Sequence, residues 1–148
     1  MTRNVVHSRA RSDAVRRALA TLPTVAQAGR LLSYSYLVDC TTIDSAIAAG
    51  DLCCFQQPIE GYNFAALAQR ACVLSFLVNA TKTGIYSVGF QNSGGDRAIS
   101  MEYTVNVTDT WEFKTILIPA SPSAGTWDYI NGVGMYVTFI LAAGTDFQ

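Results

Sequence analysis

The feature that most constrains this chain is a strict alternation of apolar and polar residues between Ala98 and Val107. The apolar positions are Ile99, Met101, Tyr103, Val105 and Val107, with Ser100, Glu102, Thr104 and Asn106 between them. Successive side chains of a β-strand point to opposite faces of the sheet. The pattern therefore predicts a strand with one face buried and the other in water.

Five further segments have strand character, because they are short, rich in β-branched and aromatic residues and bounded by turn signals. They are Asp51–Gln57, Cys72–Ala80, Gly84–Asn92, Phe113–Ile118 and Gly134–Leu141. Between two of them, the NSGGDR sequence of residues 92–97 predicts a hairpin, since its two glycines tolerate positive φ. A helical piece is expected over Asn63–Arg70. Antiparallel strands at this spacing predict an all-β fold, a β-sandwich of jelly-roll type.

The second face of several predicted strands is only half polar. In the last predicted strand, Tyr136 and Ile140 stand opposite the main apolar row, which consists of Val133, Met135, Val137, Phe139 and Leu141. A mixed face of this kind is expected where a sheet meets a partner or a ligand.

Residues 1–30 differ from the remainder, because they hold six of the ten basic residues and one acid, Asp13. Within them, Ser12–Pro23 predicts a short amphipathic helix, with Ser12 as its cap and an apolar face of Val15, Ala18, Leu19 and Leu22. We therefore expect an N-terminal basic arm or short helix over residues 1–30 and a β-sandwich domain over residues 31–148.

The arm has three interpretations. It can be an assembly segment that docks on a neighbouring subunit, a solvated tail, or a phosphate-binding segment for nucleic acid. The first aromatic residue after its arginines is Tyr34, which argues against stacking on single strands and makes nucleic acid the weakest choice. The assembly interpretation rests on Arg3, Arg9, Arg11, Arg16 and Arg17.

Composition indicates one folded domain of 148 residues, of which 50% are hydrophobic and only 14% charged, with a net charge of -1. An average globular protein has about 25% charged residues, so much of this surface is expected to be buried or in contact with partners. Residues 132–144 form the longest apolar run, which is too short for a membrane helix of about 20 residues. We expect neither a secretory signal nor a membrane partner.

Metal, cofactor and catalytic sites are not expected. Cys40, Cys53, Cys54 and Cys72 lack the spacing of metal ligands and are interpreted as buried thiols. The single histidine, His7, lies in the arm, far from any nucleophile on a strand. Glu60 and Glu102 are the nominees for a glycosidase pair, but Glu102 alternates with Ser and Thr as an ordinary solvated residue does. No enzyme is predicted.

Five segments between Asp51 and Ala143 carry a resemblance. In order they are IEGYNFAAL, VLSFLVNATKTGIYSVGFQNSGGDR, EYTVNVTDTWEFKTILIP, SAGTW and NGVGMYVTFILAAG. They resemble a jelly-roll domain of tailed-phage virion proteins, common in tail-fibre and minor structural proteins and similar in shape to carbohydrate-binding modules. The resemblance implies a virion structural protein, assembled in the host cytoplasm, with other virion proteins and copies of itself as partners.

The resemblance also implies roles for single residues. Trp111 is expected to anchor the core at the start of a strand that contains Ile116 and Ile118 and closes at Pro119. Leu77 departs from the family, whose members commonly have Trp at that position. The family domain usually continues to a further closing strand, whereas this chain stops at Gln148, so we expect an edge that Ser33–Asp39 or another subunit's strand fills.

A carbohydrate-binding module for host-surface glycans is the alternative function. Sugar sites need an aromatic platform together with groups that both donate and accept hydrogen bonds. The candidates are Gln91, Asn92, Asp96, Arg97, Glu102, Trp127 and Tyr136. In the other interpretation, Asp96 and Arg97 only finish a hairpin and Trp127 packs over the open end of the sandwich. The favoured function remains a decoration, fibre or tail-associated subunit that acts through assembly contacts.

Overall fold

The computed structural model describes residues 5–8, 13–18, 22–40 and 46–147, and these form an antiparallel, mostly β structure. The predicted all-β class is confirmed. The strands are β1 (Val5–Ser8), β2 (Asp13–Ala18), β3 (Ser35–Cys40), β4 (Leu52–Glu60), β5 (Cys72–Val78), β6 (Gly84–Asn92), β7 (Ala98–Val105), β8 (Glu112–Ile118) and β9 (Val133–Ala143). The helical elements are α1 (Val25–Ala28), α2 (Gly61–Ala65) and the final 3-10 turn η1 (Thr145–Phe147).

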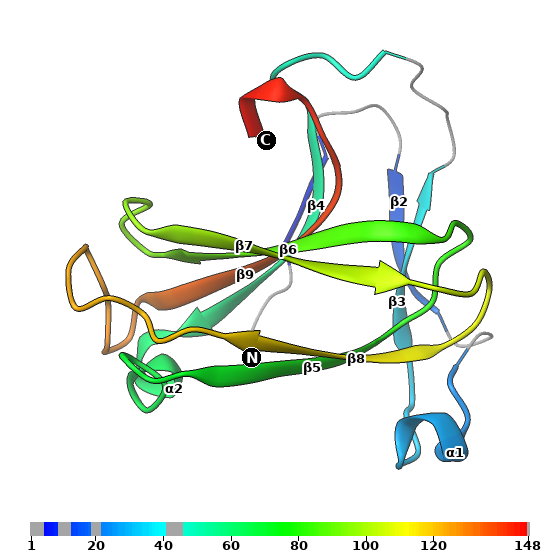
Figure 1. Ribbon diagram of the computed structural model, residues 1–148, viewed down its shortest axis with the longest axis horizontal. Coiled ribbons are helices and arrows are strands. Elements are labelled where there is room, and N and C mark those ends of the chain that lie inside the picture. Colours follow the sequence, from blue (N-terminus) through cyan, green and yellow to red (C-terminus); the bar gives the residue numbers. More distant parts are fainter. Residues whose placement is uncertain (1–4, 9–12, 19–21, 41–45, 148) are drawn as a thin grey trace.

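The strands form two facing layers and a separate ribbon (Figure 1). One layer, the large sheet, has the order β1-β4-β9-β6-β7, and the other, the small sheet, is the β5–β8 pair. The ribbon is the antiparallel β2–β3 pair, which stands across one end of the layers. Neighbours such as β4 and β9 are distant in sequence, so only the folded chain shows which residues share a face.

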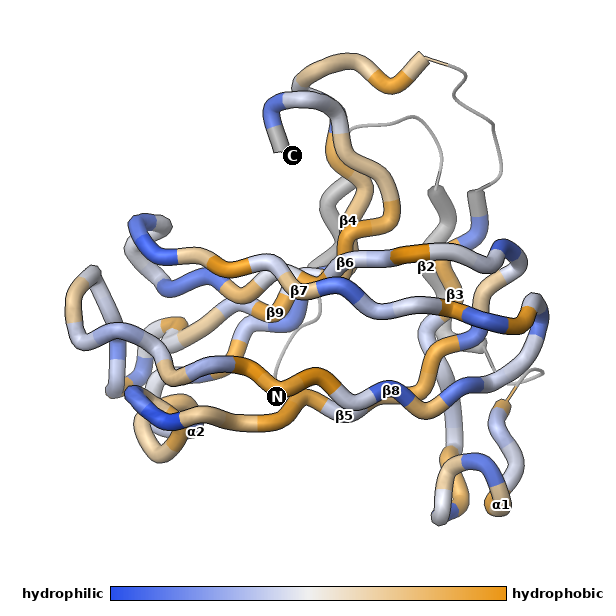
Figure 2. Tube along the Cα trace, in the orientation of Figure 1, coloured by the Kyte–Doolittle hydropathy of each residue, from blue (hydrophilic) through white to orange (hydrophobic). Residues whose placement is uncertain are grey.

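The core lies between the large and small sheets, and the predicted alternation accounts for it. Its buried residues are Phe64, Val88, Phe90, Tyr103, Val105, Ile116, Ile118, Met135 and Val137. Hydrophobic stretches follow both layers, while the turn that joins β6 to β7 is hydrophilic (Figure 2). Ile116 and Ile118 thus lie in the core as expected, whereas Trp111 is only half-buried and is not among the core residues.

The predicted helix over Asn63–Arg70 is present in part, because α2 begins earlier and ends at Ala65. Its start is fixed by the backbone N–H groups of Gly61 and Tyr62, which donate to Gly132 and Ile130 at 2.8 and 2.7 Å. Glycine is needed where α2 meets β9, since a Cβ on Gly134 would lie 2.6 Å from the Cβ of Phe64.

The predicted helix over Ser12–Pro23 is wrong, because Asp13–Ala18 forms β2 and pairs along its whole length with β3. An isolated helix of that length is marginal in water, and pairing with a strand former such as Ser35–Cys40 supplies a full ladder of hydrogen bonds instead. The strand at the edge of the large sheet also differs from the expected Ser33–Asp39 segment. Residues 35–40 pair with β2, and it is β1 that lies along β4 at the edge of the large sheet.

Aromatic rings connect the ribbon to the core. The ring of Tyr36 in β3 lies 5.2 Å from that of Phe55 in β4, and Phe55 lies 6.3 Å from Phe139 in β9. Phe139 in turn meets Phe76 of the small sheet edge-on at 5.0 Å. The β2–β3 ribbon is therefore packed against the sandwich through β4.

A β-bulge changes the direction of side chains near the end of β9. Cys54 pairs with Ile140 but Cys53 pairs with Ala142, so Leu141 has no partner across the ladder. Leu141, expected in the apolar row, is consequently exposed. Beyond this point β4 and β9 curve away from β6 and β7, on the side opposite the small sheet (Figure 1).

Candidate functional site

The first group of candidate residues lies in the hairpin that joins β6 to β7. The Asn92 side chain is completely buried, and its Nδ2 donates to Asp96 Oδ1 at 2.5 Å and to the Thr126 carbonyl at 2.9 Å. Its Oδ1 accepts from the backbone N–H groups of Asp96 and Arg97, both at 3.1 Å. The amide of Asn92 is thus fully occupied within the protein.

Asp96 completes this network. Its carboxylate accepts from the backbone N–H of Thr126 at 3.1 Å and from the Thr126 hydroxyl at 3.1 Å. The bond from Asn92, then those from Thr126, and the charge of Arg97 hold the pKa of Asp96 below its ordinary value. The Arg97 guanidinium donates to the Asp96 carbonyl at 2.6 Å. These contacts join the hairpin to the segment before β9.

Trp127 packs at the same end of the sandwich. Its ring stacks on Phe64 at 5.3 Å, and its indole N–H donates to the Ala124 carbonyl at 3.1 Å. One face of the ring and its polar atom therefore have protein partners. Four of the seven glycan candidates, Asn92, Asp96, Arg97 and Trp127, lie in this hairpin and the segment bound to it.

The other three, Gln91, Glu102 and Tyr136, lie on the outer face of the large sheet. Gln91 of β6 is directly opposite Tyr136 of β9, and Glu102 of β7 is opposite Ser87 of β6. The residues that alternate with them, such as Val88 and Phe90, point into the core. The register therefore places these three candidates on one surface, apart from the hairpin.

Sequence reasoning missed the residues between those three. Thr138 of β9 and Ser100 of β7 flank Gly89 of β6 in register, and Gln56 of β4 lies beside Thr138. The Gln56 Nε2 donates to the Thr138 hydroxyl at 3.1 Å. In the sequence, these residues could be noticed only as polar or small residues at alternate strand positions. The strand order β4-β9-β6-β7 is what brings them together on one surface. We call this surface the polar face, defined by Gln56, Ser87, Gly89, Gln91, Ser100, Glu102, Tyr136 and Thr138.

The outer side of the small sheet has the opposite character. Val73, Phe113 and Leu117 are 57%, 63% and 65% exposed. In register, Val73 pairs with Leu117, Leu77 with Phe113, and Ser75 with Thr115. These six residues define the apolar face, and none of them is charged. The alternation of Phe113, Thr115 and Leu117 was its signal in the sequence.

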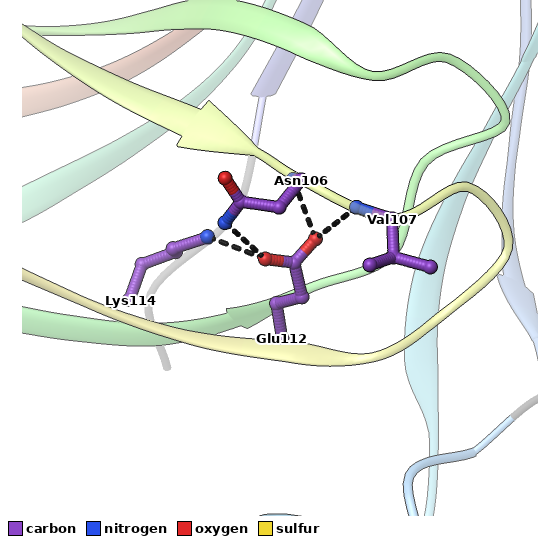
Figure 3. A network of polar contacts seen from close by, with 4 residues as sticks. All are labelled: Asn106, Val107, Glu112 and Lys114. Atoms are coloured by element: carbon purple, nitrogen blue, oxygen red, sulfur yellow. Dashed lines mark hydrogen bonds and ion pairs between the residues drawn. The ribbon is translucent and has the colours of Figure 1, made fainter.

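A second polar network fixes the connection between β7 and β8 (Figure 3). The Glu112 carboxylate accepts from the backbone N–H groups of Asn106 and Val107 at 2.8 and 3.0 Å and from Asn106 Nδ2 at 2.8 Å. Lys114 Nζ lies 2.7 Å from the same carboxylate. The bond from Lys114, followed by those from Val107 and Asn106, lowers the pKa of Glu112 to about 2.

The nominated glycosidase pair is not brought together. Glu60 pairs with Val133 of β9, whereas Glu102 lies in the row of Ser87 and Ile140. These rows are about 20 Å apart at roughly 3.3 Å per residue, well beyond the separation of about 5 to 9.5 Å that glycosidases use.

The residues of the predicted arm are described only in part. Arg3, Arg9 and Arg11 lie outside the described residues. Arg16 and Arg17 lie in β2. Of the cysteines, Cys53 and Cys54 are buried and Cys72 packs against the core.

Within the described ranges, no cluster of three His, Cys, Asp or Glu residues could hold a metal ion. In that same part of the chain, no helix is both long and apolar enough to cross a membrane.

Comparison with known proteins gave no relatives. No family model matches this chain, and no curated protein or solved structure is significantly similar to it.

Proposed function

We propose that this chain is a virion structural subunit with a jelly-roll type of sandwich, and that it assembles through the apolar face of its small sheet. The observation that carries the proposal is the exposure of Val73, Phe113 and Leu117 on one side of two short strands. Contiguous apolar surface of this kind marks contact sites on soluble proteins. The resemblance of five segments to phage virion domains supplies the virion context.

The arrangement of the apolar face favours a second copy of the same chain as its partner. The Ser75–Thr115 pair lies at the centre of the β5–β8 ladder. A local two-fold axis through that pair relates Val73 to Phe113 and Leu77 to Leu117, apolar to apolar. Two copies placed face to face with their Ser75–Thr115 pairs aligned therefore bring hydrophobic side chains together in either orientation.

Charge supports the same partner. A two-fold contact brings each patch against itself, so a patch with a net charge would repel its own copy. The apolar face has no charged residue, and its two polar members, Ser75 and Thr115, are hydroxyls that can both donate and accept. The face is therefore compatible with itself.

The experiment is light scattering of the full chain after size-exclusion chromatography. Wild-type protein is expected to form a dimer or a larger oligomer. The double variant Phe113→Ser/Leu117→Ser is expected to be monomeric, because it removes two exposed apolar side chains from the contact. Both positions are exposed, so folding should be retained, which circular dichroism checks.

Ile85→Ser is the matched control, since Ile85 is 69% exposed on the large sheet and its loss removes comparable apolar surface elsewhere. It should have the wild-type mass. A monomeric wild-type protein, or equal masses for all three proteins, would contradict assembly through the apolar face.

A further inference from the structure

We propose that the polar face of the large sheet is a separate binding site for a neutral polysaccharide chain. This inference does not rest on assembly, because the polar face and the apolar face belong to opposite layers of the sandwich (Figure 1). Of the seven residues that the sequence suggested for glycan binding, only Gln91, Glu102 and Tyr136 lie on the polar face.

The register arranges the polar face as parallel rows across four strands. The middle row is Gln56, Thr138, Gly89 and Ser100, taken from β4, β9, β6 and β7 in that order. Tyr136 and Gln91 stand side by side in the next row on one side, and Ser87 and Glu102 on the other. An aromatic ring, two amides, three hydroxyls and one carboxylate thus surround a glycine.

Gly89 has no evident role in the fold itself. Its φ lies outside the positive region, and a Cβ at this position would meet only the Thr138 carbonyl oxygen, at 3.9 Å. Glycine in the interior of a strand weakens the strand and often marks a place where a ligand comes close to the backbone. Its effect here is to leave the centre of the polar face flat.

The groups around Gly89 suit sugar hydroxyls. Sugar hydroxyls both donate and accept, and the Gln and Ser side chains can meet either need. The Gln56 Nε2 donates to the Thr138 hydroxyl, so the proton of that hydroxyl remains available to a ligand. Tyr136 offers the ring surface on which a sugar can rest, with the Gln91 amide beside it.

Charge selects against other polymers. The strands β4, β6, β7 and β9 contain no Lys or Arg, and Glu102 gives the polar face one negative charge. Nucleic acids and acidic polysaccharides need cationic partners, so both are disfavoured. A neutral chain of linked hexoses is not repelled by this charge, and its hydroxyls can donate to the Glu102 carboxylate.

The first experiment applies the full-length protein to an array of neutral oligosaccharides (glucans, mannans and galactans) together with oligogalacturonate as the acidic comparison. Retention of at least one neutral oligosaccharide, and weaker retention of the acidic one, is expected. The best neutral oligosaccharide is then titrated by calorimetry against wild-type and variant proteins.

Gly89→Val is the decisive variant. A β-branched residue fits a strand and has room here, so the melting temperature should equal or exceed that of wild type. Its side chain nevertheless rises from the centre of the polar face and should weaken binding at least about tenfold, as should Tyr136→Ala. Ser75→Val, which makes a similar change on the apolar face, should bind as wild type does.

Two results would overturn the inference. One is an array on which no neutral oligosaccharide is retained, or on which only the acidic one is. The other is a binding constant for both Gly89→Val and Tyr136→Ala within about twofold of wild type. Neither result depends on the oligomeric state, so the assembly proposal stands or falls separately.

Discussion

The amide of Asn92 is completely buried, and its four hydrogen bonds reach Asp96, Arg97 and Thr126. A single side chain therefore closes the β6–β7 hairpin and ties it to the segment that leads into β9. A buried polar group is stabilising only while its partners are all present. Asn92, selected from the sequence as a ligand contact, is engaged within the protein at every polar atom of its side chain.

Replacement of Asn92 by Ala should lower the free energy of unfolding by about 2–4 kcal/mol, because the donors and acceptors it leaves behind lose their partners. Urea unfolding followed by circular dichroism measures this change. Gln91→Ala, the adjacent exposed amide, should change it by less than about 0.5 kcal/mol. Equal effects at the two positions would show that burial of the Asn92 network contributes nothing.

At the scale of elements, the β7–β8 connection depends on Glu112, whose carboxylate accepts from the backbone N–H groups of Asn106 and Val107 after β7 and from Lys114 within β8 (Figure 3). Its folded-state pKa of about 2 lies below the ordinary value of 4.5. A depressed carboxyl pKa contributes stability that is fully present above the unfolded-state pKa. That contribution is lost as the pH falls towards the folded-state pKa.

Glu112→Gln should therefore lower the urea midpoint at pH 7, by less at pH 3, and hardly at all near pH 2, as unfolding curves at the three pH values would show. The loss occurs between about pH 4.5 and 2, where the unfolded chain takes up the proton first. Glu102→Gln, which changes an exposed carboxylate on β7, serves as the control. A midpoint difference that stays constant down to pH 2 would contradict the role of the Glu112 charge.

The elements show how far local pattern determines structure. Alternation predicted β6 and the buried residues Tyr103 and Val105 of β7, because one buried face imposes a period of two on the sequence. Ile99 and Val107, expected in the same buried row, are exposed, and β7 ends at Val105. The helical repeat of Val15, Ala18, Leu19 and Leu22 predicted the wrong structure for Asp13–Ala18, because pairing with a strand some twenty residues away decides the outcome. The exposure of Leu141 also escaped prediction, since a bulge depends on the register with β4 and not on β9 alone.

At the scale of the whole molecule, the candidate sites could be predicted only in part. Gln91, Glu102 and Tyr136 were chosen by residue type, and the register places them on one face of the large sheet. Gly89 and Thr138 were missed because their role follows from strand order, which a single sequence does not reveal. The loop residue Trp127 looked like a platform, yet one face of its ring stacks on Phe64.

Assembly through the apolar face should be insensitive to salt. Exposed charges attract one another less as salt is added, whereas apolar contacts keep or gain strength. The dissociation constant from sedimentation velocity should thus be equal or lower in 1 M sodium chloride than in 0.1 M. A marked weakening in high salt would instead indicate association through the basic residues of the N-terminal segment.

Because the apolar and polar faces lie on opposite layers, the fold limits how many ligand surfaces one assembly can bind at the same time. Two subunits joined back to back through β5 and β8 would direct their polar faces away from each other. Such a dimer would gain no avidity on one flat surface, because its two sites face in opposite directions and could not bind that surface at the same time. It would act as a cross-linker between two polymer chains, and polysaccharide mixed with the intact pair would gel or precipitate, while the monomeric variant would leave it in solution.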